Sequence, residues 1–322
     1  MPELPEVETI ARQLQGLIVG RRIAEFVSHW HRVTEPLTAK DFHGRLVGRR
    51  ITAVGRRGKF VVIELEGDEA LIVSLRMTGQ LLFREADAAE DRFVRALLTF
   101  EDGTLLRFAD TRKFGRMQIV DLADLLDAPR ARRTAGPLHG SLGIEPLSRR
   151  FTVRWLAAML KRRARAAIKP LLLDQREIAG VGNIYDIEAL WRARIHPLRT
   201  ASSLKPAEIV RLHEAIRWVL RKGIRLGGAS RRDYVDARGN AGRMQGEFSL
   251  YDRAGEPCPR CGRAIVRTVV GGRGTFHCPH CQRPPALSGG AARSRRQAAR
   301  PVRGEGSTRA APRRRPRAAP GG

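Results

Sequence analysis

The sequence has few cysteines and no long apolar run. Its 322 residues include only four cysteines, and all of them lie within residues 258–281. This clustering suits a metal site in a reducing compartment better than a disulfide framework. No stretch reaches the roughly 18 to 20 apolar residues of a membrane span, and the acidic, proline-containing start lacks the basic and apolar regions of a signal peptide. We therefore expect a cytoplasmic protein with no membrane partner.

Acidic residues are also scarce. The chain has 33 Asp and Glu against 60 Lys and Arg, which gives a formal net charge of +27. Such an excess predicts a polyanionic partner, either nucleic acid or an anionic membrane surface. Residues 282–322 contain eleven Arg and one Glu among Ala, Pro and Gly. This segment cannot bury enough apolar surface to offset its ordering entropy, so we expect a disordered basic tail. The remainder of the chain is basic as well.

The hydrophobic pattern divides the chain into a β-rich and a helical part. Residues 1–17 predict an amphipathic helix, with Pro5 at its first position and Glu6 and Glu8 near the positive end of its dipole. Eight short β-rich runs then follow between residues 21 and 121, separated by turn residues. Strands without intervening helices indicate an antiparallel sandwich or barrel.

Helical patterns dominate after a Pro-, Gly- and Arg-rich stretch at residues 130–150, which we interpret as a linker. Amphipathic helices are predicted for residues 151–165 and 206–222, the second with Gly223 just past its end. The last unit, residues 245–282, is too small to form a core of its own. It therefore needs a covalent or metal cross-link.

The cysteines supply that cross-link. They form two C-x2-C pairs with sixteen residues between them, the spacing of a tetrahedral zinc site, with ligands Cys258, Cys261, Cys278 and Cys281. Four protein ligands leave no position for water, so we expect one structural Zn²⁺. His277 and His280 are then spare, and we expect them on the surface or facing a nucleic acid.

Two further segments have the chemistry of phosphate contacts. The residues between the cysteine pairs predict a β-hairpin with Arg273 at its tip, where an arginine is either solvated or binds phosphate. The sequence GVGN, ending at Asn183, predicts a glycine turn before a helix N-terminus, which is a common anion site. A simple capping role for Asn183 remains an alternative.

Several turns of the β-rich part carry basic or apolar residues. Lys59 follows a glycine turn, and Met77, Arg112 and Phe114 lie in two other turns between strands. Ordinary core or solvated roles are possible for each of them. In a cationic protein, exposed apolar residues on loops also suit insertion into a base stack.

Together these motifs resemble the formamidopyrimidine-DNA glycosylase and endonuclease VIII family. The resemblance runs from Pro2 to about residue 282 and rests on PELPEVET, GKF, MTG, D-x-R-K-F-G, AGVGNIY, RIHP, GEPC and the cysteine pairs, in the family's order. It implies a multidomain α+β fold. Its expected parts are a catalytic β-sandwich domain with an amino-terminal helix (2–130), a linker (131–150), a helix-two-turn-helix domain (151–243), a zinc-finger hairpin (244–282) and the disordered tail (283–322).

The resemblance also implies an activity, namely base-excision repair by a bifunctional DNA glycosylase and abasic-site lyase. Removal of Met1 would leave Pro2 as an amine nucleophile, which is less basic than a lysine and so more often unprotonated at neutral pH. Glu3 is implied as the general acid and base, Lys59 as a catalytic lysine that contacts phosphate, and Glu6 as a supporting acid, with a capping role as the equal alternative. The PELPEV start favours oxidised purines such as 8-oxoguanine and formamidopyrimidines as substrates.

The same resemblance assigns the DNA contacts. Met77, Arg112 and Phe114 would fill the gap that a flipped nucleotide leaves, and Asn183 and Arg273 would clamp phosphates. Damaged double-stranded DNA is thus the expected partner, and a nucleoid-associated monomer the expected form. An oxidised-pyrimidine glycosylase of the endonuclease VIII type remains an alternative, because residues 227–253, where the family's lesion-recognition loops vary, leave the substrate preference open. A non-catalytic zinc-ribbon protein that binds DNA or RNA is the other alternative, since the basic tail and the cysteine pairs would suffice for it.

Overall fold

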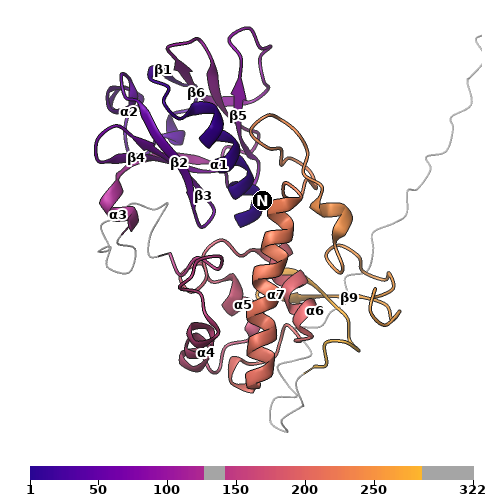
Figure 1. Ribbon diagram of the computed structural model, residues 1–322. Coiled ribbons are helices and arrows are strands. Elements are labelled where there is room, and N and C mark those ends of the chain that lie inside the picture. Colours follow the sequence, from indigo (N-terminus) through magenta and orange to yellow (C-terminus); the bar gives the residue numbers. More distant parts are fainter. Residues whose placement is uncertain (127–141, 285–322) are drawn as a thin grey trace, which may run out of the picture.

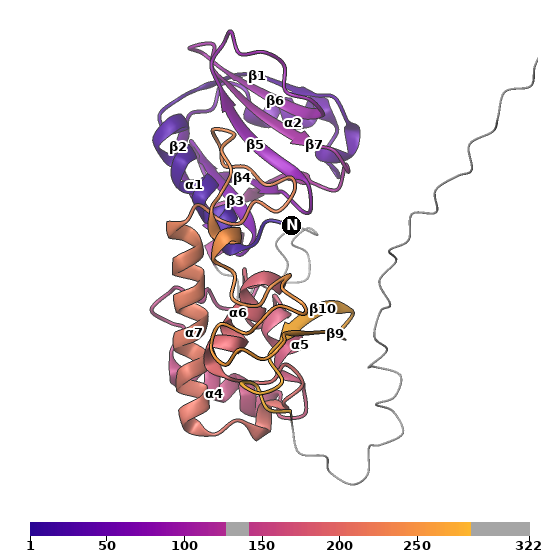
Figure 2. The same cartoon turned by 90° about the vertical axis from the view of Figure 1, so that its right-hand side faces the viewer.

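The structure is a computed structural model that describes residues 1–126 and 142–284 (Figure 1). Most of the expected linker and nearly all of the expected basic tail lie outside the described residues. The described residues form a β-rich half and a helical half, with helix α1 (Leu4–Ile18) where they meet. Figure 2 shows the zinc-finger hairpin against the helical half.

The β-rich half is an antiparallel sandwich, as the strand pattern predicts. One sheet has the strand order β1-β6-β7-β5 and the other has the order β2-β3-β4-β8. All eight predicted strands are present, at β1 Ile23–Ser28, β2 Ile51–Arg57, β3 Phe60–Leu65, β4 Glu69–Ser74, β5 Gly79–Arg84, β6 Val94–Phe100, β7 Leu105–Asp110 and β8 Arg116–Asp121.

The alternation of side chains along the strands builds the core between the sheets. In β6, Ala96, Leu98 and Phe100 are buried and the residues between them are more exposed. This period of two is the pattern of a strand with one face on the core. The sequence pattern did not predict the short helices η1 (His31–Val33), α2 (Ala39–Leu46) and α3 (Leu122–Leu126).

Helix α1 contributes to both hydrophobic cores. Leu4 packs in the core of the helical half, whereas Val7 and the following apolar residues pack in the core of the sandwich. The backbone N–H of Leu4 also donates a 3.0 Å hydrogen bond to the carbonyl oxygen of Gly180 in the helical half. The first turn of α1 is therefore fixed from both sides.

The helical half consists of α4 (Val153–Arg162), α5 (Ile168–Leu173), α6 (Asn183–Ala193), η2 (Ala201–Ser203), α7 (Pro206–Arg225) and η3 (Met244–Glu247). The side chain of Thr152 caps α4 by accepting a hydrogen bond from the N–H of Trp155. Across residues 1–126 and 142–284, every helix is too short or too polar to cross a bilayer.

The hairpin of β9 (Val266–Val270) and β10 (Arg273–His277) forms the last unit. Its apolar cluster is small, and it includes Ile187 of α6 besides Ile265 and Phe276 of the unit itself. The hairpin is therefore held against α6 as well as by its own side chains. The multidomain α+β fold is confirmed, with a sandwich, a helical part and a cysteine-bearing hairpin.

One helix boundary differs from the prediction. Gly223 was expected just past the end of a helix, but α7 continues to Arg225 and Gly223 lies inside it. A Cβ atom at this position would come within 2.5 Å of Cε1 of Tyr185. The glycine thus allows close packing of α7 on α6, and its function as a helix stop was predicted wrongly.

We therefore expect Gly223→Ala to lower the free energy of unfolding, by about 1 to 3 kcal/mol, because overpacking displaces the Tyr185 ring. Gly16→Ala is the matched control, since Gly16 is also helical but has open space around it, and alanine favours the helix by about 0.5 to 1 kcal/mol. Thermal unfolding of both variants tests this prediction. Equal melting temperatures would contradict the packing argument.

Candidate functional site

A cavity of about 540 Å³ opens where the two halves and the hairpin meet. Its volume is in the range of ligand-binding pockets, which is about 300 to 1,000 Å³. Six of the predicted site residues line it together, namely Pro2, Glu3, Lys59, Met77, Asn183 and Arg273. The structure therefore brings together residues that are as far as 271 positions apart in the sequence.

Glu3 is held at the N-terminus of α6. Its carboxylate accepts hydrogen bonds from the backbone N–H groups of Ile184, at 3.0 Å, and Tyr185, at 3.4 Å. These donors lie in the first turn of the helix, where N–H groups have no partner within the helix and favour an anion. A Cβ atom on Gly182 would lie 2.2 Å from Cδ of Glu3. Only glycine therefore lets Glu3 approach this helix end.

Glu6 is fully buried and joins three segments. Its carboxylate accepts hydrogen bonds from the N–H of Glu3 at 2.8 Å, the hydroxyl of Tyr185 at 2.7 Å and the N–H of Ala229 at 2.8 Å. Burial, and then the nearby Glu3, raise the pKa of Glu6. Glu6 therefore caps α1, which is one of its two predicted roles, and its support of the site stays a prediction. The sequence pattern missed Tyr185 and Ala229.

Lys59 follows the turn between β2 and β3, and this turn is held by partly buried ion pairs. Arg56 pairs with Glu8 of α1 and with Glu145, each at 2.8 Å, and the N–H of Gly58 donates to Glu145 at 2.6 Å. Arg56 is therefore structural rather than part of a solvated basic turn. Burial lowers the pKa of Lys59, which also lies near Glu3 and Arg273.

Asn183 opens α6 and links two parts of the site. Its Oδ1 accepts a 2.8 Å hydrogen bond from Lys169, and its Nδ2 donates a 2.9 Å hydrogen bond to the carbonyl of Gly274 in the hairpin. Lys169 is completely buried and also pairs with Asp186. Burial raises the pKa of Asp186 to about 6, although Lys169 acts in the opposite direction. Lys169 was not singled out from the sequence.

Met77, Arg112 and Phe114 form one exposed cluster on two neighbouring turns of the sandwich. Met77 is 43% and Phe114 48% exposed. The guanidinium of Arg112 lies 5.0 Å from the centre of the Phe114 ring, and its Nη1 is 3.4 Å from the sulfur of Met77. These large side chains point out of the sandwich beside the cavity, as insertion into a base stack would require.

Buried Asp110 holds the two turns in place. Its carboxylate accepts hydrogen bonds from the hydroxyl of Thr78, from the N–H of Arg112 at 3.1 Å and from the N–H of Gly115 at 2.7 Å. The Asp110 side chain thereby fixes the residue after Met77 in one turn, and residues on both sides of Phe114 in the other turn. Asp110 appears in the D-x-R-K-F-G motif, but no role was predicted for it.

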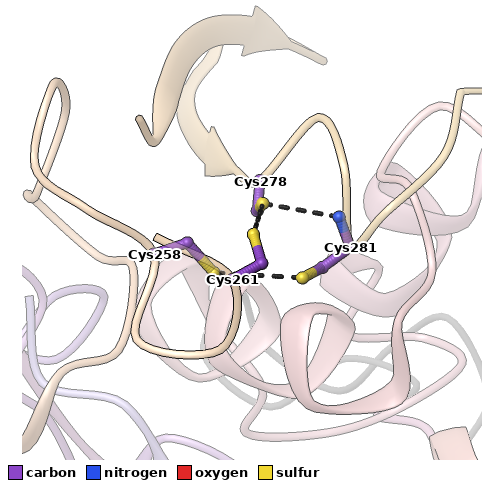
Figure 3. A group of neighbouring side chains, drawn as sticks. All are labelled: Cys258, Cys261, Cys278 and Cys281. Atoms are coloured by element: carbon purple, nitrogen blue, oxygen red, sulfur yellow. Dashed lines mark hydrogen bonds between the residues drawn. The ribbon is translucent and has the colours of Figure 1, made fainter. Parts of the chain in front are cut away.

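The four predicted cysteines meet in one cluster (Figure 3). All four sulfur atoms lie within 4.8 Å of one another. The sulfurs of Cys258 and Cys281 are 4.0 Å apart and those of Cys261 and Cys278 are 3.5 Å apart. Zn–S bonds of about 2.3 Å in a tetrahedron place sulfurs about 3.8 Å apart, so the cluster fits a structural Zn²⁺.

The expected surface position of His277 is wrong. This residue is 6% exposed, and its ring packs edge-on against His196 with 4.6 Å between the ring centres. His280 is exposed, as expected. His277 therefore joins the hairpin to the helical half, through a contact that periodicity does not reveal.

Three family models match the chain. They describe the formamidopyrimidine-DNA glycosylase N-terminal domain (residues 1–117), the formamidopyrimidine-DNA glycosylase H2TH domain (142–235) and the zinc finger found in FPG and IleRS (255–284). The formamidopyrimidine-DNA glycosylases of Roseiflexus sp. (strain RS-1) and Enterococcus faecalis are 48% and 44% identical to this chain in sequence. Each alignment covers 88% of this chain, together with 100% and 97% of the respective relatives.

Solved structures give the same result. The Lactococcus lactis Fpg (MutM) in complex with DNA that contains N7-benzyl-Fapy-dG is 36% identical, with a TM-score of 0.79 and coverage of 88% of this chain and 100% of that one. The structure of the same Lactococcus lactis protein in complex with abasic-site DNA also has a TM-score of 0.79 and 36% sequence identity to this chain. The chain belongs to the formamidopyrimidine-DNA glycosylase family. It is thus a zinc-containing base-excision repair glycosylase and abasic-site lyase with DNA as its partner.

The hub at Asp110 yields one prediction. Asp110→Ala leaves the donors of Thr78 and Gly115 without their acceptor, and each lost partner costs about 1 to 3 kcal/mol. The N–H of Arg112 keeps only its 3.2 Å hydrogen bond to the hydroxyl of Thr78. We expect weaker binding to lesion-containing duplex, by about tenfold or more, with the overall fold kept. Exposed Asp87 supplies the control, Asp87→Ala, and a fluorescence titration measures both. Unchanged DNA affinity in Asp110→Ala would show that the hydrogen bonds of Asp110 are not needed for DNA binding.

The cysteine cluster yields a second prediction. Removal of Zn²⁺ by a chelator, or Cys258→Ser, should unfold the hairpin unit, because binding of a structural Zn²⁺ supplies about 10 to 16 kcal/mol in zinc-finger peptides. DNA affinity should fall, while the sandwich keeps its β-sheet circular dichroism signal. Zinc content and affinity are measured on the same samples. A zinc-free protein that binds DNA normally would rule out this support role.

Proposed function

We propose that this enzyme excises oxidised purines, such as 8-oxoguanine and formamidopyrimidines, through a covalent intermediate on Pro2. The observation that carries the proposal is that Pro2, Glu3 and Lys59 line one cavity together. Removal of Met1 would be required, because the nitrogen of an internal Met-Pro bond is an amide without nucleophilic character. The freed Pro2 is a secondary amine at the cavity wall.

The proposed chemistry follows from that amine. Its lone pair attacks C1′ of the damaged nucleotide, the bond from C1′ to the base nitrogen breaks, and the base departs after gaining a proton. The nitrogen then loses its proton, and its lone pair breaks the bond from C1′ to the sugar ring oxygen, which takes up a proton. Because the amine is secondary, the C1′=N product is a positively charged iminium. This cation acidifies the C2′ proton, so its removal expels the 3′-phosphate by β-elimination. A second elimination then expels the 5′-phosphate.

Glu3 and Lys59 are suited to the proton and phosphate steps. Glu3 is proposed to protonate the sugar ring oxygen as the ring opens and to move protons during elimination. The α6 N–H groups that hold its carboxylate fix its orientation. Lys59, which lines the same cavity, is proposed to contact the flanking phosphate and to assist at the base. Glu6 is proposed to support Glu3 through the hydrogen bond to its N–H.

The DNA contacts are proposed from exposure and charge. The cluster of Met77, Arg112 and Phe114 would occupy the gap left by the flipped nucleotide. Arg273, exposed at the hairpin tip, and Asn183 at the start of α6 would hold phosphates on either side. Because Asn183 is bonded to Lys169 and Gly274 in the free protein, we propose that its backbone N–H contributes more than its amide group.

We propose a monomer, since every proposed site residue belongs to one chain, acting at the nucleoid and divided into units at the expected boundaries. An oxidised-pyrimidine substrate is the second candidate. One observation favours this candidate. The structure of the Lactococcus lactis relative has also been solved with DNA that contains an oxidised pyrimidine, and that structure has 36% sequence identity and a TM-score of 0.78 to this chain.

Borohydride trapping tests the proposed function. A duplex with 8-oxoguanine opposite cytosine should give a reduced covalent complex whose crosslink maps to Pro2, with Met1 absent. Pro2→Gly should retain DNA binding but excise much more slowly. Glu3→Gln should lower the excision rate roughly 10²- to 10⁴-fold, as for loss of a general acid or base.

The control is Glu25→Gln, which changes an exposed residue of β1 and should react like the unmodified protein. Trapping only with an oxidised pyrimidine would keep the chemistry and transfer the assignment to the second candidate. A crosslink at a residue other than Pro2 would refute the proposed nucleophile.

A further inference from the structure

Trp218 is a large apolar side chain that α7 leaves exposed. It is 40% exposed, and Val210, about two turns earlier on the same helix, is 39% exposed. The contacts of α7 with the core of the helical half come from other residues, including Leu212, Ile216 and Val219. Figure 2 shows α7 at the left edge of the helical half, on the side away from the hairpin of β9 and β10. Trp218 therefore serves neither this core nor the cavity of about 540 Å³.

Cations from two helices surround the Trp218 indole. The guanidinium carbon of Arg192, near the end of α6, lies 3.6 Å from the centre of the indole ring. Nζ of Lys222, further along α7, lies 5.3 Å from the ring centre and pairs with Glu247 at 2.8 Å. These distances are those of cation–π contacts. One face of the ring is therefore covered by a guanidinium group, and the exposed part of the indole lies among positive charges.

More positive charge lies where α6 ends. The guanidinium of Arg260, in the first cysteine pair, lies 4.3 Å from the centre of the Trp191 ring and donates a 3.0 Å hydrogen bond to the Trp191 carbonyl. Arg211 of α7 donates a 3.5 Å hydrogen bond to the carbonyl of Ala193. The carbonyl end of a helix carries only about half a negative charge. It therefore offsets a small part of the charge that these guanidinium groups bring.

The arginines of this surface repel one another. Burial, and then the nearby Arg260, lower the pKa of Arg192, and Glu214 acts in the opposite direction. On α7, burial and then Arg221 lower the pKa of Arg217. A lowered arginine pKa means that the surroundings disfavour the positive charge. An anionic partner would relieve this repulsion.

The exposed side chains around Trp218, which we call the Trp218 patch, are Arg192, Arg211, Trp218, Arg221 and Arg260. A DNA backbone would offer this patch phosphates but no apolar group, and the indole face that Arg192 covers is closed to a stacking base. An acidic peptide with a large apolar side chain offers both kinds of contact. Its carboxylates match the planar fork of arginine, and Trp and Arg are typical of the centre of a protein–protein interface.

We propose that the Trp218 patch docks an acidic segment of another protein, with carboxylates on the guanidinium groups and a large apolar side chain against the indole. Helix α6 begins at Asn183 in the wall of the cavity and ends at Ala193, about 15 Å further along the helix axis. The patch is therefore separate from the cavity. Docking does not depend on the proposed function, and the two are tested separately.

Titration of the full-length protein with a synthetic peptide tests the docking. The probe is a short peptide of Asp and Glu residues that contains one Phe and one Leu. With 5-fluorotryptophan, the four tryptophans of the chain give four ¹⁹F signals, and Trp218→Phe identifies the signal of Trp218. We expect that signal to shift in a saturable way, while the signal of Trp30 in the sandwich stays unchanged. A peptide with Ser in place of Phe and Leu should bind about tenfold more weakly or less, because the indole loses its apolar partner.

Variants test the charges of the patch. Arg192→Glu and Trp218→Ala should each weaken peptide binding by about tenfold or more, measured by fluorescence anisotropy of a labelled peptide. Lys40→Glu is the matched control, because it reverses one charge on an exposed residue of α2, outside the patch. All three variants should excise a damaged base at nearly the unmodified rate, which also shows that they are folded, since none of the three residues lines the cavity.

Three outcomes would overturn the proposal. One is the absence of a saturable shift at Trp218, and another is an equal loss of peptide affinity in Arg192→Glu and Lys40→Glu. A shift of the Trp218 signal that is larger with an undamaged duplex than with the peptide would assign the patch to nucleic acid. None of these results affects the borohydride crosslink at Pro2, so the proposed function stands or falls by a different experiment.

Discussion

The structure depends on the burial of two carboxylates at the start of α1. A buried carboxylate is strongly unfavourable unless donors surround it. Glu3 meets this requirement with the first turn of α6, and Glu6 meets it with the N–H of Glu3, the hydroxyl of Tyr185 and the N–H of Ala229. The sandwich helix, the helical half and the 229–243 loop therefore have to converge at this point, and the cavity lies beside it.

Local patterns predicted much of this architecture. Most of the eight strands have a period of two or a β-branched run, and most of the turns between them contain glycine or aspartate, so adjacent residues were enough to find them. The cysteine spacing also predicts the geometry of the metal site, since two C-x2-C pairs suit an ion with tetrahedral coordination. The resemblance to a family added what no local pattern contains, which is a reason to place Pro2, Glu3 and Lys59 in one site.

Contacts between distant residues were not predictable from those patterns. Gly223 looks like a helix stop, and only the ring of Tyr185 explains why α7 needs a glycine in its interior. His277 looks like a surface residue until it meets His196. Arg56 and Glu145 pair across 89 positions, and Asp110 organises two turns. In each case the chemistry of one residue is set by a partner that its own sequence neighbourhood does not identify.

Helix α1 places Leu4 in one core and its later apolar residues in the other. Neither core is complete without this helix, so thermal disruption of one half also removes packing from the other. The two halves should therefore unfold cooperatively, although each half has its own hydrophobic core. Since the same helix begins beside Glu3 and Pro2, partial melting would also displace these two residues from the cavity that they line.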